Sequence, residues 1–141
     1  MPRINFYALS SHEESSRLQL ACRVAEKAVE KGHQVFIQVS TEAECDRLDK
    51  LLWEFKPASF LPHALAGASD SDDVAVLIGC GDCPAGATDV LINLRSTACV
   101  QHQQFEIINE IITADPDSVA TGRKSYTFYR SLGYPLDTHK L

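Results

Sequence analysis

The sequence predicts an α/β fold in which helices cover both faces of a mostly parallel sheet. Short apolar runs alternate along the chain with segments of helical periodicity. Two of these runs, Val74–Ile78 and Val90–Leu94, are dense in β-branched residues, as is typical of strands buried on both faces. The length of 141 residues and the hydrophobic content of 45% suit one domain with its own core. We therefore expect a single three-layer α/β/α, Rossmann-like domain over residues 1–141.

The first strand–helix pair is predicted over residues 4–32. Ile4–Leu9 is a short apolar run that predicts the first strand. Ser11 and Glu14 have the spacing of a capping box at the start of a helix, and Gly32 ends that helix. Its buried stripe is formed by Leu18, Ala21, Val24, Ala25, Ala28 and Val29.

The second pair follows directly. His33–Val39 predicts the second strand, and Thr41 with Glu44 repeats the capping-box spacing before a helix that ends near Trp53. Ser59–Ser69, which mixes small residues with large apolar ones, predicts an ordered loop or an irregular strand.

Two further helices are expected after the Val90–Leu94 strand. Ser96 is a possible N-cap for the first, whose apolar stripe would be Phe105, Ile108, Ile111 and Ile112. The second begins at Pro116 and ends before Gly133, with Phe128 and Leu132 toward the core.

Composition excludes several classes of protein and function. The net charge of −6 and the pI of about 5.3 argue against general attraction to nucleic acid or to an anionic membrane. No stretch approaches the ~20 apolar residues of a bilayer span, and the N-terminal apolar run is too short for a signal peptide. We expect a cytoplasmic protein. Charge is nevertheless uneven, because residues 123–141 hold four basic residues and one acid, against nine basic and eighteen acidic residues elsewhere.

No motif for nucleotide or phosphate binding is present. The first β-to-α turn, residues 8–14, contains no glycine, whereas a dinucleotide site needs glycines there so that the backbone can approach pyrophosphate. We therefore expect no cofactor and no catalytic residues. A small nucleotide-binding α/β enzyme remains an alternative, with its ligand near Ser10–Ser11 or Gly79–Gly81 at the carboxyl ends of the strands.

Cys80 and Cys83 form a lone C-x-x-C after a predicted strand. A structural zinc site needs four ligands, and no second pair completes one nearby, although His63, His102 and Cys99 are distant candidates. An ordinary turn is the favoured interpretation. The other two cysteines, Cys22 and Cys45, fall in predicted helices and are expected to pack as small apolar residues.

Two aromatic patches indicate interaction surfaces. The first holds the single tryptophan and spans a helix end and the following loop, although such residues can also seal a sheet edge. It consists of Trp53, Phe55, Pro57, Phe60, Leu61, Pro62 and Leu65. The second is the last helix, where Arg123, Tyr126 and Arg130 share one face. Two guanidinium groups beside a tyrosine suit an acidic peptide with an apolar end, and stacked single-stranded bases are the alternative ligand.

Three stretches of sequence resemble the chi subunit of bacterial DNA polymerase III. They are Trp53 with Pro57-Ala58-Ser59-Phe60-Leu61-Pro62-His63-Ala64-Leu65-Ala66-Gly67, then Asp89-Val90-Leu91-Ile92-Asn93-Leu94-Arg95, then Tyr129-Arg130-Ser131-Leu132-Gly133-Tyr134. The Phe6-Tyr7 strand, the long first helix and the overall length also fit this family.

The resemblance implies a non-catalytic accessory subunit of the clamp-loader complex. Family members bind the psi subunit, forming a heterodimer, and grip the acidic C-terminal tail of single-stranded DNA-binding protein, so that contact with DNA is indirect or weak. The resemblance departs at Thr127, where we expect a lysine, and in the shorter segment 114–121. The positions implied for psi are Trp53, Phe60, Leu61 and Pro62, and those implied for the tail are Arg123, Tyr126, Thr127 and Arg130.

Overall fold

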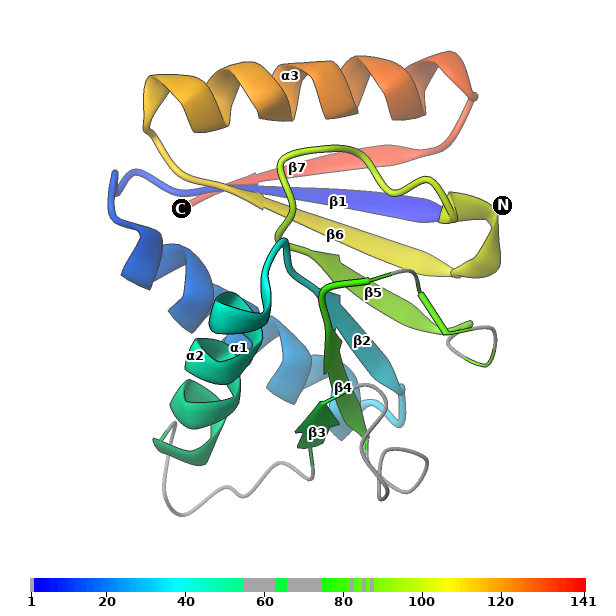
Figure 1. The fold of residues 1–141 in the computed structure, drawn as a ribbon. Coiled ribbons are helices and arrows are strands. Elements are labelled where there is room, and N and C mark those ends of the chain that lie inside the picture. Colours follow the sequence, from blue (N-terminus) through cyan, green and yellow to red (C-terminus); the bar gives the residue numbers. More distant parts are fainter. Residues whose placement is uncertain (1, 55–62, 66–74, 82, 85, 87) are drawn as a thin grey trace.

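The computed structural model describes residues 2–54, 63–65, 75–81, 83–84, 86 and 88–141. In this part of the chain, seven strands form one sheet in the order β3-β4-β2-β5-β6-β1-β7, and all paired strands are parallel. Helices α1 and α2 lie on one face and α3 on the other (Figure 1). The predicted three-layer, mostly parallel α/β fold is confirmed. The elements are β1 Arg3–Ala8, α1 Glu14–Glu30, β2 Val35–Gln38, α2 Glu42–Glu54, β3 His63–Leu65, β4 Val76–Gly79, β5 Val90–Asn93, the short 3-10 helix η2 His102–Gln104, β6 Ile107–Ile112, α3 Pro116–Ser131 and β7 Leu136–Lys140.

The start of α1 differs from the predicted capping box. The Ser11 hydroxyl accepts the backbone N–H of Glu13 at 3.1 Å, which turns the chain before the helix begins at Glu14. The Glu14 carboxylate does not return to Ser11 but accepts the Arg17 guanidinium at 2.8 Å. An acidic residue in the first turn still favours the helix through its dipole. Gly32, with φ of 88°, follows the C-terminal end as predicted.

The hydroxyl half of the predicted capping box of α2 is present. The Thr41 hydroxyl accepts the Glu44 backbone N–H at 3.2 Å and donates to the Glu44 carboxylate at the same distance. Leu48 and Leu52 are buried below it. Within the predicted Ser59–Ser69 segment, residues 63–65 form β3, and the rest lies outside the described residues.

The helix predicted from Ser96 is wrong. The chain after β5 forms a loop and the short η2, and the predicted apolar stripe falls mainly on β6. In a strand, Ile108 and Ile111 point to opposite faces, and each joins a different core cluster. The polar residues between them, Asn109 and Glu110, are buried in the sheet. A fully buried strand has no polar face, so its periodicity was misleading.

The last helix is confirmed, but its inward-facing residues were predicted incorrectly. Phe128 is 39% exposed and Leu132 is 40% exposed, whereas Tyr129 is completely buried. The inner face of α3 is formed by Gly122, Ser125 and Tyr129, which recur at helical spacing, and Phe128 lies about 100° away from Tyr129 around the axis.

A seventh strand follows Gly133 and was not predicted. β7 pairs with β1 at the edge of the sheet, and its residues are almost all exposed. Gly133 has a φ of 79°, which allows the tight reversal between α3 and this strand. No helix in the described part is both long enough and apolar enough to cross a membrane.

Candidate protein-binding surfaces

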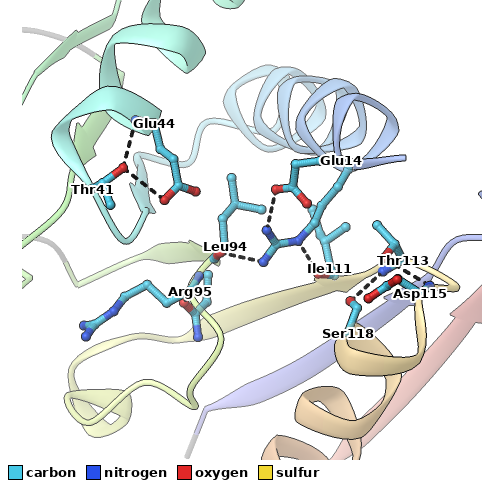
Figure 2. A network of polar contacts seen from close by, with 11 residues as sticks. Glu14, Thr41, Glu44, Leu94, Arg95, Ile111, Thr113, Asp115 and Ser118 are labelled. Carbon is cyan, nitrogen blue, oxygen red and sulfur yellow. Dashed lines mark hydrogen bonds and ion pairs between the residues drawn. The ribbon is translucent and has the colours of Figure 1, made fainter. Parts of the chain in front are cut away.

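The N-terminus of α3 is fixed by side chains that cap free backbone groups. The Asp115 carboxylate accepts the backbone N–H of Asp117 at 3.2 Å, and Pro116 occupies the first turn, where a missing N–H costs nothing. Ser118 turns back and accepts the N–H of Thr113 at 2.9 Å (Figure 2). The direction of α3 across the sheet is therefore set at its first turn.

Small residues hold α3 close to the sheet. Gly122 is buried, and a Cβ atom at this position would lie 2.9 Å from Cγ2 of Ile112. Ser125 is buried one turn later, and the Tyr129 ring fills the space beyond it. Because α3 lies close to the sheet, side chains on its flank contact residues of β1 and β7, as Tyr126 does.

The four α3 residues predicted for tail binding lie on one flank of the helix. Arg123, Thr127 and Arg130 are exposed, and Tyr126 is half-buried. The Tyr126 ring rests on Phe6 of β1, with 5.3 Å between ring centroids. Arg123 and Arg130 are two turns apart, about 10 Å along the axis, and Tyr126 lies between them. The flank thus offers two cations around a ring supported by the sheet.

β7 adds residues to this flank that the sequence analysis missed as a site. Thr138 pairs with Phe6, whose side chain packs on the α3 side of the sheet. Residues directly opposite in paired strands share a face, and alternate residues repeat it. The residues of β7 on the α3 side are therefore Leu136, Thr138 and Lys140. We call this flank of α3 together with those β7 residues the α3–β7 surface.

The α3–β7 surface combines cations with an apolar base. Leu136 packs against the core cluster beneath α3, together with Tyr126. Guanidinium groups bind carboxylates with two parallel hydrogen bonds, and a tyrosine ring beside an aliphatic side chain accepts an apolar end group. This arrangement can bind a short acidic peptide.

Trp53 marks the other predicted surface, at the C-terminal end of α2. Its side chain is 57% exposed, although the neighbouring Leu52 is buried. An exposed tryptophan at a helix end offers a large apolar area that loses little side-chain entropy on binding. Phe60, Leu61 and Pro62, the other predicted residues of this surface, lie outside the described residues.

A buried polar network connects α3 to the sheet. The Tyr129 hydroxyl donates to the Glu110 carboxyl at 2.9 Å, and the Asn93 amide donates to the same oxygen at 2.8 Å. The backbone N–H of Cys99 donates to the Tyr129 oxygen at 2.9 Å. Burial raises the pKa of Glu110 to about 8, despite the two donated hydrogen bonds. This network anchors α3 and the loop after β5 and is sealed from solvent.

The carboxyl ends of β5 and β6, where a nucleotide would bind in an α/β fold, are filled by a side chain of α1. The Arg17 guanidinium donates to the carbonyl oxygens of Leu94 at 2.5 Å and Ile111 at 2.9 Å, and it also pairs with Glu14 (Figure 2). These contacts hold the N-terminal part of α1 against the ends of the two strands.

None of the five cysteines forms a disulfide bond. Cys22 and Cys45 are buried, as expected for small apolar residues, and burial raises the pKa of the Cys45 thiol to about 11. Cys83 hydrogen-bonds Cys99, which lowers the pKa of Cys99. Among the described residues, no three histidine, cysteine or acidic side chains come together in a way that would hold a metal ion.

Comparison with known proteins gives one family. Residues 1–137 match the model of the DNA polymerase III chi subunit, HolC. The chain is 38% identical to DNA polymerase III subunit chi of Pseudomonas aeruginosa, over 100% of this chain and 98% of that protein. It is 28% identical to the Escherichia coli subunit chi, over 98% of this chain and 97% of the relative. The identity to the Haemophilus influenzae subunit chi is 26%, over 96% and 95%.

Proposed function

The chain belongs to the chi-subunit family of DNA polymerase III, and from that premise we propose that it is a non-catalytic adaptor with two protein partners. One surface, at the C-terminal end of α2, binds the psi subunit. The other, the α3–β7 surface, binds the acidic C-terminal tail of single-stranded DNA-binding protein. The adaptor thereby links the replicase to coated single-stranded DNA.

The observation that carries the tail assignment is the half-buried Tyr126 between two exposed arginines. Arg123 and Arg130 are positioned to receive acidic side chains of the tail or its terminal carboxylate. Tyr126, supported by Phe6, forms one wall for the apolar end of the tail. Lys140 on β7 contributes a further positive charge on the same face of the sheet.

The position of Thr127 affects how the tail is held. A neutral threonine replaces a cation that we expect at this position, and the exposed Lys124 lies on a different side of the helix. Rim charges mainly tune association rate and salt dependence, so the loss of one leaves the site functional. Lys140 is a candidate to compensate for it.

Support for the psi assignment is the exposure of Trp53 on the side of the sheet opposite to α3. Its 57% exposed side chain belongs to α2, which packs on the other face of the sheet from the α3–β7 surface (Figure 1). The two partners therefore contact different faces and can bind at the same time. This separation is what an adaptor requires.

Calorimetry with a peptide that carries the acidic tail tests the tail assignment. Arg123→Ala should weaken binding about tenfold or more, because hydrogen bonds to charged groups contribute roughly 1.5–3 kcal/mol. Lys50→Ala, an exposed cation on α2, is the matched control and should leave the affinity unchanged. If the two variants bind the peptide equally well, the tail does not use the α3–β7 surface.

Co-purification with psi tests the other surface. Trp53→Ala should remove psi from the complex but retain tail binding, and Phe60→Ala should behave in the same way. Circular dichroism checks that each variant is folded. Trp53 is exposed, so its removal should cost little stability. Retention of psi by both folded variants would show that the helix-end patch is not its binding site.

A further inference from the structure

A groove of about 320 Å³ runs along the sheet face opposite to α3, between α1 and the strands β1 and β6. It lies on the opposite face of the sheet from the α3–β7 surface. One wall is the apolar side of α1, formed by Leu20, Val24 and Ala28, and the floor is formed by residues of β1 and β6. Its size is at the lower end of the range for pockets that bind small ligands.

Three cations line the groove from α1 and its C-cap. Arg23, Lys27 and Lys31 are exposed and recur every four residues, so they stand in a row about 6 Å apart along the helix. None of them forms an ion pair with another side chain in the described part of the chain. Two acids at the margins of the groove are engaged by other groups, because Asp89 pairs with His33 at 2.8 Å and Asp137 pairs with Arg3 at 3.2 Å. The row is thus available for an anionic ligand with regularly spaced charges.

The floor of the groove carries amides that can both donate and accept hydrogen bonds. The Asn109 amide donates to the Leu91 carbonyl oxygen, and its own oxygen accepts from Asn5 at 3.2 Å. Asn5 retains its side-chain oxygen and a second N–H toward the groove. A nucleobase edge presents this mixture of donors and acceptors, whereas a carboxylate only accepts.

Aromatic rings lie along the β7 side of the groove. Tyr7 lines it, and the ring of His139 on β7 stacks on Tyr7, with 4.8 Å between centroids and 19° between planes. His139 is exposed. Cations that follow a backbone, beside rings on which bases stack, are the common features of proteins that hold single-stranded nucleic acid.

We propose that this groove binds a short segment of single-stranded DNA, with phosphates along Arg23, Lys27 and Lys31 and a base against the Tyr7–His139 pair. An acidic peptide would use the cations but neither the amide floor nor the rings. The strongly acidic remainder of the chain limits the contact to a few nucleotides and makes it weak and dependent on salt. This proposal does not depend on the psi or tail assignments.

Fluorescence anisotropy of a short labelled oligothymidine, measured on the isolated protein at pH 8 across a salt series, tests the proposal. Three phosphate contacts predict a slope of log K against log salt of about −2, since each contributes roughly −0.7 for a single strand. Lys27→Ala should weaken binding and reduce the magnitude of the slope by about 0.7. His139→Ala should weaken binding about fivefold through lost stacking.

Lys50→Ala on α2 and Arg123→Ala on α3 are controls, and neither should alter oligonucleotide binding. Three outcomes would overturn the proposal. One is no binding at low salt, and another is binding whose slope depends on Arg123 but not on Lys27. The third is an acidic peptide that binds the groove more tightly than the oligonucleotide does and loses affinity on Lys27→Ala.

Discussion

Replacement of Glu110 by glutamine should make the protein more stable, by an amount that grows with pH. Glu110 is 4% exposed, and burial raises its pKa from 4.5 to about 8. The folded protein therefore keeps a proton on Glu110 that the unfolded chain releases above pH 4.5. Because the unfolded state binds fewer protons in this window, the contribution of Glu110 to stability declines as pH rises from 4.5 to about 8, and it is level outside that window.

The size of the effect follows from the two pKa values. At 1.36 kcal/mol per pKa unit, the rise from 4.5 to about 8 corresponds to a loss on the order of 5 kcal/mol across the window. Glutamine has the same shape, does not ionise, and keeps an oxygen that accepts from Tyr129 and Asn93. The difference in unfolding free energy between variant and wild type should therefore grow by about 1.4 kcal/mol per pH unit.

Urea denaturation at several pH values between 5 and 8, followed by circular dichroism, measures this difference. Comparison with the variant at each pH removes the contribution of every other titrating group. Glu106→Gln, which changes an exposed carboxyl just before β6, is the control and should alter stability by less than about 0.5 kcal/mol. If the unfolding free energies of wild type and Glu110→Gln change with pH in parallel, the conclusion that Glu110 is held protonated in the folded protein is refuted.

Three further predictions concern α3 and α2. Gly122→Ala should destabilise the protein by about 1–3 kcal/mol despite the better helix propensity of alanine, because the new Cβ would lie 2.9 Å from Ile112. In an Ile112→Ala background the same change should stabilise the protein. Thermal melting of the wild type, the two single variants and the double variant measures both effects. Thr41→Ala should cost about 1 kcal/mol through loss of the α2 cap, and urea denaturation in which Thr41→Ser retains most of that stability would support this cause. Tyr129→Phe leaves the N–H of Cys99 without its acceptor and should cost about 1–3 kcal/mol, with faster amide hydrogen exchange at Cys99; unchanged exchange there would contradict the role of the hydroxyl.

The elements that sequence predicted well are those with local signals. Thr41 and Glu44 fix the start of α2 through a contact between residues three apart, and both the sequence and the structure show it. Pro116 and Gly133 likewise mark the two ends of α3. Proline favours the first turn of a helix and glycine favours the positive φ that follows a helix, whatever the tertiary contacts are. The Arg123–Tyr126–Arg130 flank was predicted for the same reason, since helical spacing alone brings these residues together.

The β6 strand was missed because its environment is not local. Asn109 and Glu110 look like a solvated face in the sequence, yet both are buried through bonds to residues that are distant along the chain. Nothing within six residues of Glu110 indicates that Asn93 and Tyr129 will satisfy its carboxyl. A buried polar pair inside a strand therefore imitates an amphipathic helix until the partners are known.

The β7 strand was missed because an exposed edge strand carries little apolar pattern, and the omission matters for both surfaces. Its alternation directs Leu136, Thr138 and Lys140 toward α3 and places Asp137 and His139 on the α1 side. The same strand thus contributes Leu136, Thr138 and Lys140 to the α3–β7 surface on one face of the sheet, and on the other face it places His139 against Tyr7, which lines the groove. A slip of one residue in the β1–β7 register would exchange these sets, moving Lys140 to the groove side and His139 to the α3 side. The Arg3–Asp137 ion pair and the Tyr7–His139 stack both require the observed register, so the contacts that align β7 also decide which charge each surface presents.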